Sequence, residues 1–133
     1  MQAHDTQESA ALARLERILA RELDADVVEW LAAGFARHLA GAPLDAALRL
    51  DRASRIRARD QALIEAARAL GPRPSCWLGA VALAQAVRRF KSRVLPFVHD
   101  GRELGPVERA LWAAWRAYPR LPATPQGLQH LLK

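Results

Sequence analysis

Several residue types that define other protein classes are scarce in this chain. Its 133 residues include one cysteine, Cys76, so no disulfide can form within it, as is typical of a reducing compartment. Aromatic residues make up only 6% and β-branched residues are few, which disfavours a β-sheet. The longest uncharged apolar stretch, residues 74–87, is shorter than the roughly 18 residues of a membrane span. Residues 1–7 lack the apolar core of a signal peptide, so we expect a cytoplasmic protein without a membrane segment.

The residues that are abundant favour helices. Hydrophobic residues make up 51% of the chain, and alanine, leucine, arginine and glutamate dominate it. These side chains lose little conformational freedom in a helix. A length of 133 residues suits one domain with a core of its own. The sequence therefore predicts a single helical domain over residues 1–133, in which residues 1–5 are disordered.

Glycine and proline divide the apolar periodicity into segments. The firmest break is Gly71-Pro72-Arg73-Pro74, and similar breaks follow residues 40 and 118. Residues 43–52 and 54–70 could form one helix or two, since neither glycine nor proline separates them. The prediction is an all-α protein, an irregular bundle of six to seven helices with Pro- and Gly-rich turns. The expected helices span residues 6–23, 27–40, 43–52, 54–70, 76–91, 106–118 and a short stretch after Thr124-Pro125.

The periodicity also predicts which faces are buried. In 27–40, an apolar stripe at helical spacing should face the core. The helix that Ser75 caps is apolar nearly all round at its start and should lie at the centre of the bundle. Residues 94–105, with one proline and two glycines, should form a surface loop. The stripe of the second helix consists of Val28, Leu31, Phe35 and Leu39.

Positive charge is the main functional lead. The net charge is +6, with −4 in residues 1–29 and +10 in residues 30–133. Arginine outnumbers lysine 18 to 2. A GC-rich genome is one explanation of this bias. Selection for phosphate or carboxylate binding by the planar guanidinium group is the other.

Two arginine-rich stretches, Arg49–Arg59 and Arg88–Arg93, predict a surface that contacts nucleic acid mainly through phosphate. The alternative is a solvated helix face for the first stretch and favourable cations at a helix C-terminus for the second. Residues 121–132 could also begin a base-reading helix, although the usual short preceding helix is missing. The predicted binding residues are Arg49, Arg52, Arg55, Arg59, Arg88, Arg89, Lys91 and Arg93.

No cluster of residues predicts catalysis. The four histidines, His4, His38, His99 and His130, are far apart and none has the spacing of a metal ligand to an acid or cysteine. No glycine-rich phosphate loop is present. We therefore expect a protein that is not an enzyme and that has no catalytic residues, no metal and no cofactor.

A second hypothesis is a protein-interaction module. Trp30 and Trp112 fall off the main apolar stripes, and an exposed tryptophan is a common interface anchor. The acidic first helix could also pair with the basic remainder of another copy, which would give a homodimer or a homo-oligomeric adaptor. On this hypothesis the partner is an acidic protein or a second copy of the chain.

A pattern of helix and arginine positions extends through residues 44–132. It consists of Arg57-x-Arg59-Asp60-x-x-Leu63-x-x-Ala66-Ala67, then Ala80-x-x-Leu83-Ala84 leading to Arg88-Arg89-Phe90, then Leu111, and Leu121-Pro122 before Leu128 and Leu131. In this pattern the chain resembles small proteins of unknown function from proteobacterial prophages and other mobile elements. The resemblance implies no activity and no site residues. It favours nucleic-acid handling or inhibition of host machinery.

Overall fold

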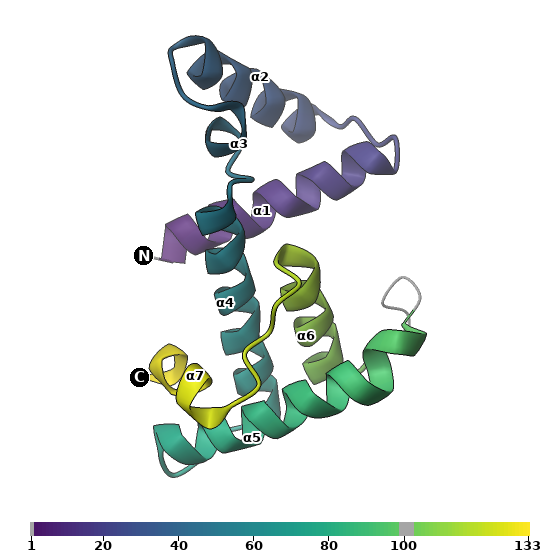
Figure 1. The fold of residues 1–133 in the computed structure, drawn as a ribbon. Coiled ribbons are helices and arrows are strands. Elements are labelled where there is room, and N and C mark those ends of the chain that lie inside the picture. The colour runs from purple at the N-terminus through teal and green to yellow at the C-terminus, as the bar shows by residue number, and fades with distance from the viewer. Residues whose placement is uncertain (1, 99–102) are drawn as a thin grey trace. The chain divides into compact units, whose positions relative to one another are not determined.

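The fold is all-α, as the sequence predicts (Figure 1). The structure, a computed structural model, describes residues 2–98 and 103–133, without the side chains of residues 2–9. Over this range it contains no strand. The α-helices are α1 (Gln2–Leu19), α2 (Ala25–Leu39), α3 (Leu44–Ala47), α4 (Arg52–Leu70), α5 (Cys76–Arg89), α6 (Pro106–Ala117) and α7 (Pro125–Gln129).

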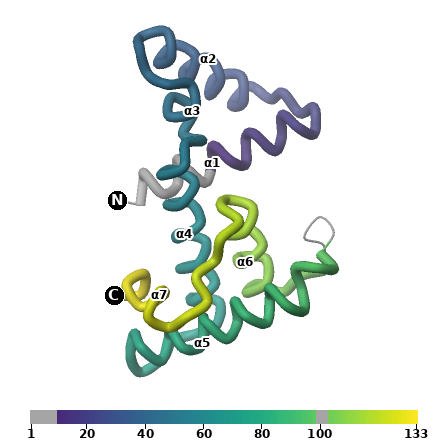
Figure 2. The backbone as a smooth tube through the Cα atoms, in the orientation of Figure 1, coloured from purple at the N-terminus to yellow at the C-terminus, as the bar shows by residue number. Residues whose placement is uncertain are grey.

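The chain divides into two compact units. Unit 1 comprises Met1–Ala58 and unit 2 comprises Arg59–Lys133, so the boundary falls inside α4. Figure 2 follows the backbone through both units. The expectation of one domain stays a prediction, as does the expected disorder of residues 1–5, whose side chains lie outside the described part.

Unit 1 has a small apolar core. Ala11, Trp30 and Leu48 form its buried cluster, with Leu15 and Ile18 packed against it. The first helix begins and ends four residues earlier than predicted, and Arg21 then adopts a left-handed conformation with φ 65°. Leu19 and Leu23, which the sequence predicts on the buried stripe, are therefore exposed.

Helix α2 presents a different face to the core from the predicted one. Its buried residues are Val27, Trp30 and Gly34. Gly34 permits a close approach of α3, because an added Cβ would overlap the side chain of Leu48. The predicted inward stripe is consequently turned outward, and Val28, Phe35 and Leu39 are exposed. The prediction was wrong for these three residues, whereas Leu31 is half-buried and packs against the core as predicted.

Helices α3 and α4 are separate, which answers the question that the sequence left open. Arg49 has a left-handed backbone with φ 59°, so the helix does not continue through it. Asp51 then caps α4: its carboxylate accepts hydrogen bonds from the Ser54 amide at 3.3 Å and the Ser54 hydroxyl at 2.6 Å.

Unit 2 has the larger core, built from one face of each of its helices (Figure 1). Helix α5 is capped as predicted, because Ser75 Oγ accepts a hydrogen bond from the Leu78 amide at 3.1 Å. Its first turn is nonetheless exposed, with Trp77 and Leu78 in solvent, and burial begins at Ala80. The buried cluster consists of Leu63, Ala66, Ala80, Leu83, Ala84, Val87, Phe90, Leu111, Ala114, Leu121 and Leu128.

The C-terminal end of α5 is not a plain loop. The helix widens into a π-turn, Phe90–Val94, followed by a 3-10 turn, Leu95–Phe97. The predicted surface loop over 94–105 is therefore wrong at its start, while residues 99–102 lie outside the described part. Phe90 anchors the π-turn in the core, and the exposed residues around it are mostly basic.

The last two helices start where the sequence places them. Pro106 is the first residue of α6, and Pro125 is the first residue of α7. Thr124 caps α7 by accepting a hydrogen bond from the Gly127 amide at 3.2 Å. Within the described residues, no helix is both long enough and apolar enough to cross a membrane.

Candidate phosphate-binding surface

The excess of positive over negative charge lies in unit 2. Residues 59–133 contain twelve Lys and Arg against five Asp and Glu, a net charge of +7. Residues 1–58 contain eight against nine, a net charge of −1. The structure thus assigns Arg49, Arg52 and Arg55 to a nearly neutral unit and the other five predicted residues to the basic one.

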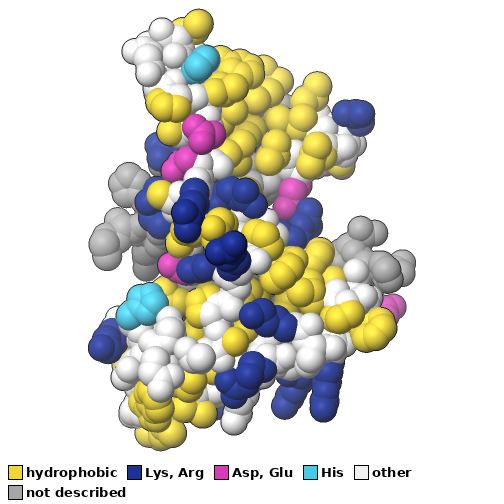
Figure 3. Space-filling view, viewed as in Figure 1, with side chains coloured by type: hydrophobic (Ala, Val, Ile, Leu, Met, Phe, Trp, Pro, Cys, Tyr) yellow, Lys and Arg dark blue, Asp and Glu magenta, His cyan; other side chains and the backbone are white. Residues whose placement is uncertain are grey.

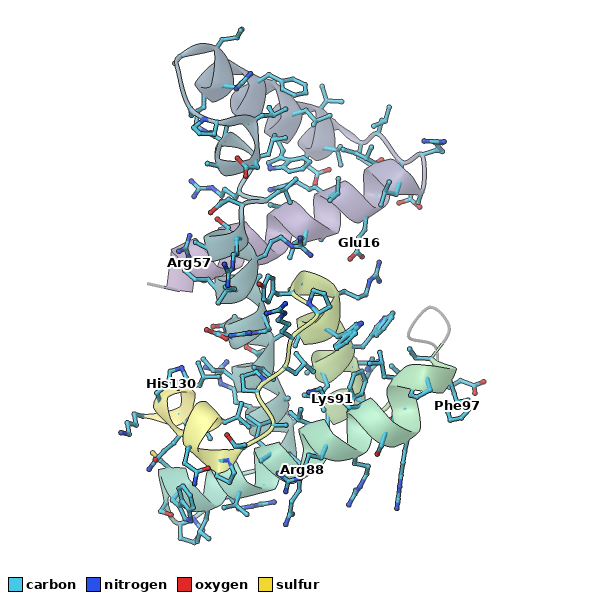
Figure 4. The ribbon with its side chains drawn as sticks, viewed as in Figure 1. Glu16, Arg57, Arg88, Lys91, Phe97 and His130 are labelled. Carbon is cyan, nitrogen blue, oxygen red and sulfur yellow. The ribbon has the colours of Figure 1, made fainter. Side chains whose placement is uncertain are left out.

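Three of the predicted residues in unit 2, Arg59, Arg88 and Lys91, contact the extended segment 118–124, which connects α6 to α7. Arg59 on α4 donates to the carbonyl of Arg120 at 2.8 Å, and Lys91 donates to the carbonyl of Leu121 at 3.1 Å. Arg88 donates to the carbonyl of Ala123 at 2.7 Å. Figure 4 labels Arg88 and Lys91 beside this segment. Three predicted phosphate ligands therefore also hold a non-helical stretch of backbone.

The carbonyls of this segment explain why it attracts cations. An extended, proline-containing stretch has no helical partners for its carbonyl oxygens, and buried or half-buried carbonyls require donors. Leu121 is buried, so its neighbours are held close to the core. The proline content of 119–125 was the only sequence signal for such unpaired carbonyls, and it does not identify the donors.

Arg59 is the most fully engaged of the predicted residues. Its Nε and one terminal nitrogen donate to Asp60 at 3.0 and 2.8 Å, and its other terminal nitrogen bonds Arg120. The guanidinium carbon lies 5.8 Å from the centre of the Tyr118 ring. Its side chain is only 15% exposed. This geometry supports a structural role for Arg59, and its predicted contact with phosphate stays a prediction.

Arg89 and Arg93 are different because they are exposed and have no partner among the described residues. Together with Arg88 and Lys91 they lie at the C-terminal end of α5 and in the π-turn. Four cations therefore fall within the six residues 88–93. Arg88 and Lys91 also remain exposed despite their single hydrogen bonds. We name Arg88, Arg89, Lys91 and Arg93 the α5 basic end. Figure 3 shows Lys and Arg side chains on one face of the molecule.

The first stretch is divided between local tasks. Arg49 lines a cavity of about 330 Å³ in unit 1, together with Arg14, Arg37 and Trp30 and the acids Asp26 and Glu29. Arg52 and Arg55 lie on the first turns of α4, where both take part in interactions within the protein. None of these three arginines lies in the unit that has the excess of positive charge.

Trp30 and Trp112, the two tryptophans of the protein-interaction hypothesis, are not both exposed. Trp30 is 8% exposed, because it lies on the inward face of α2, so its ring packs in the core of unit 1 and is not exposed to a partner. Trp112 is half-buried, and the Arg116 guanidinium lies 5.6 Å from its ring centre. The indole nitrogens of both are buried without a hydrogen-bond partner among the described residues.

Two acidic residues of unit 1, Asp24 and Asp26, form ion pairs within it. Arg17 on α1 binds Asp24 at 3.2 Å and also binds Asp26 in the first turn of α2. This hydrogen bond lowers the pKa of Asp26 and raises that of Arg17. Asp24 and Asp26 therefore tie α1 to α2, and neither lies on the acidic first helix, whose pairing with another copy stays a prediction.

Helix α7 and Cys76, both in unit 2, provide no further candidate site. Helix α7 has only five residues and passes into a 3-10 turn at His130, so it is too short for a base-reading helix. Cys76 borders a mostly apolar cavity of about 400 Å³ at the opposite end of α5 from the basic end, and its thiol donates to the Leu132 carbonyl. No group of three potential metal ligands gathers within the described residues.

Known proteins do not narrow these possibilities. No family model, no curated protein and no solved structure matches the chain.

Proposed function

We propose that unit 2 binds nucleic acid through its phosphates, using the α5 basic end. The observation that carries the proposal is the concentration of unpaired positive charge. Unit 2 has a net charge of +7, and the guanidinium groups of Arg89 and Arg93 form no hydrogen bond or ion pair with any described residue. Phosphate contacts by Arg and Lys supply most of the affinity in binding that does not depend on sequence.

The helix dipole does not account for four cations. A helix C-terminus has a partial charge of about −0.5, which one cation already offsets. The α5 basic end contains four cations, and its hydrogen bonds to carbonyls leave their formal charges unchanged. The remaining positive potential favours a partner with closely spaced negative charges, such as a phosphodiester backbone.

The same geometry argues for binding without base recognition. The α5 basic end lies on the last turn of a helix and a π-turn, and α7, which contains the candidate base-reading residues, has only five residues. We therefore propose contacts to the backbone, similar for DNA and RNA, and no catalytic step.

The test is the salt dependence of binding, measured by fluorescence anisotropy on mixed-sequence DNA and RNA at 50 and 200 mM salt. We expect R89Q/R93Q to lower the slope of log K against log salt by about 1.8, since each phosphate contact contributes roughly 0.9. The matched control is R68Q/R73Q, which removes the same charge from unit 2 near the other end of α5.

Two outcomes would contradict the proposal. The first is that wild-type protein fails to bind either nucleic acid at 50 mM salt. The second is that R68Q/R73Q lowers the slope as much as R89Q/R93Q does, which would mean that net charge alone matters and that the α5 basic end is not the contact surface.

A further inference from the structure

Unit 1 contains a cavity of about 330 Å³ that is lined by residues of α1, α2 and the turn after α3 (Figure 1). We name it the unit 1 cavity. Its volume is at the lower end of the range for small-molecule sites, roughly 300–1,000 Å³. All of its lining belongs to one compact unit. The charged residues of the lining are Arg14, Arg37, Arg49, Asp26 and Glu29.

Two buried donors beside this cavity have no acceptor. Trp30 lines the cavity and is more than nine-tenths buried, and its indole N–H has no hydrogen-bond partner in the part of the chain that the structure describes. The buried Nε–H of Arg14 also lacks one, since the carboxylate of Asp26 is 3.7 Å away, beyond hydrogen-bond distance. A buried donor without an acceptor costs free energy and requires an explanation, such as a bound ion or water.

Arg49 adds a guanidinium group that the protein itself does not use. The residue is half-buried, lines the cavity, and forms no hydrogen bond or ion pair with any described residue. Arg37 donates from Nε and one terminal nitrogen to the Ala47 carbonyl, at 3.1 and 2.5 Å, which leaves its other terminal nitrogen available. Guanidinium groups match the spacing of oxygens on an oxyanion. The cavity can therefore offer an oxyanion donors from Arg49, Arg37 and Trp30.

The charge around the cavity is positive and indicates the kind of oxyanion. Three arginines line the cavity against two acids, of which Asp26 is bound by Arg17 from outside the lining. Counting Arg17, the net charge is +2. A phosphate monoester has a charge of about −1.5 to −2 at pH 7. A carboxylate or a phosphodiester group has a single negative charge, so the charge balance favours the monoester.

We propose that the unit 1 cavity binds the phosphate group of a small phosphate monoester. Arg49 and the indole N–H of Trp30 donate to the phosphate oxygens, while Arg37 and Arg14 add positive charge. The site lies in the other unit from the α5 basic end and takes a small molecule instead of a nucleic acid. The two proposals share no residue, so each fails or survives separately.

The first test follows the indole N–H signals of the full chain in ¹⁵N NMR spectra at pH 7, with ionic strength held constant by chloride. The probes are inorganic phosphate, glycerol phosphate and acetate. We expect the Trp30 signal, assigned with W30F, to shift and saturate with both phosphates, and acetate to bind more weakly. Trp112 is an internal control, because its indole N–H also lacks a partner but it does not line this cavity. Its signal should not move.

The second test compares two variants that lose the same charge from the same kind of backbone. Arg49 and Arg21 both have left-handed backbones, with φ 59° and 65°, so glycine fits at either position. R49G should weaken phosphate binding at least tenfold, because it removes charge-assisted hydrogen bonds. R21G changes the same unit outside the cavity and should leave the affinity within about twofold of wild type. Circular dichroism checks that both variants keep their helices.

Glu29 provides a change in the opposite direction. It is an exposed acid of the lining without a partner among the described residues. E29Q removes a negative charge beside the bound phosphate and should strengthen binding severalfold. An affinity that falls in E29Q would indicate that the cavity takes a cation, which contradicts the proposal.

The remaining outcomes are equally decisive. Saturable binding that R49G weakens and R21G does not supports the proposal, provided that R89Q/R93Q leaves it unchanged. A Trp30 signal that responds to neither phosphate up to about 10 mM overturns it, and the cavity then holds water alone. Equal weakening by R49G and R21G also overturns it, because the net charge of the unit would then explain the effect.

Discussion

Asp51 shows how one side chain sets the start of a long helix. It precedes α4, and its carboxylate accepts hydrogen bonds from both the amide and the hydroxyl of Ser54. These bonds stabilise the charged form, with the Ser54 hydroxyl as the largest contribution, and hold the pKa of Asp51 below its ordinary value. The negative charge also suits the N-terminal end of a helix.

We expect Asp51→Ala to reduce the free energy of unfolding by about 1 kcal/mol at pH 7, the usual cost of losing an N-cap. Because the pKa of Asp51 is lower in the folded protein than in the unfolded chain, its charge contributes stability above the unfolded pKa, near 3.8. That contribution is lost as pH falls through the folded pKa. Urea unfolding of wild type and Asp51→Ala at pH 7 and pH 3 measures both effects.

Asp51→Asn provides the control for this prediction. The amide oxygen can still cap α4 but has no charge, so this variant should be more stable than Asp51→Ala and should lose less stability than wild type at pH 3. Equal stabilities of the two variants at pH 7 would show that the cap contributes nothing.

The caps were the most predictable residues. Ser75 follows a proline and precedes an apolar run, and Thr124 precedes Pro125, so residue type and context agree at both positions. The start of α4 was predicted two residues late, at Ser54, because Asp51-Arg52-Ala53-Ser54 contains two capable caps. The backbone decides which of the two caps the helix: α4 begins at Arg52, so Asp51 is the cap and its carboxylate accepts from the Ser54 amide.

At the scale of elements, α2 shows where periodicity fails. Both Val28, Leu31, Phe35 and the alternative Val27, Trp30, Gly34 have helical spacing, so the sequence supports either face. The deciding feature is Gly34, which has no side chain and lets Leu48 pack onto the helix. Because periodic patterns weigh side chains, they give no weight to the glycine that determines this contact.

The carbonyl contacts of the predicted surface residues could not be read from the sequence for a related reason. Charge clusters can be counted from sequence, and Arg89 and Arg93 are exposed as the basic-surface hypothesis requires. The carbonyl partners of Arg59, Arg88 and Lys91 belong to segment 118–124 and are 30 or more residues away along the chain. Hydrogen bonds to such distant backbone leave no pattern in the residue order.

Lys91→Met tests the structural role of this segment. Methionine keeps the aliphatic stem and removes the hydrogen bond to the Leu121 carbonyl, so we expect a loss of about 0.5–1.5 kcal/mol in the free energy of unfolding. Arg89→Met removes a charge of the same sign from an exposed position and should change stability by less than about 0.5 kcal/mol. Urea unfolding followed by tryptophan fluorescence compares the two, and equal losses would assign the effect to charge.

At the scale of the whole molecule, net charge was predictable and the division of the chain was not. The sequence places the change from acidic to basic after residue 29, whereas the boundary between the units falls between residues 58 and 59. That boundary lies inside α4, which has neither glycine nor proline to mark it. A continuous helix can contribute to two compact units without any break in composition.

The unequal cores predict unequal stabilities. The buried cluster of unit 1 consists of Ala11, Trp30 and Leu48, whereas that of unit 2 contains eleven residues. We therefore expect unit 1 to unfold at lower urea concentration. The indole N–H signal of Trp30 in ¹⁵N NMR spectra should disappear before those of Trp112 and Trp115.

Simultaneous loss of the indole signals would show instead that the chain unfolds in one step.

The π-turn at the end of α5 has a consequence for changes in chain length. Its hydrogen bonds join residues five apart instead of four, so Phe90–Val94 contains one residue more than an ordinary helical turn. Removing one residue there would restore α-helical geometry and rotate everything that follows by about 100°. The direction in which Phe97 points is therefore set by a single inserted position, and this turn is where a deletion would redirect the chain without breaking the helix.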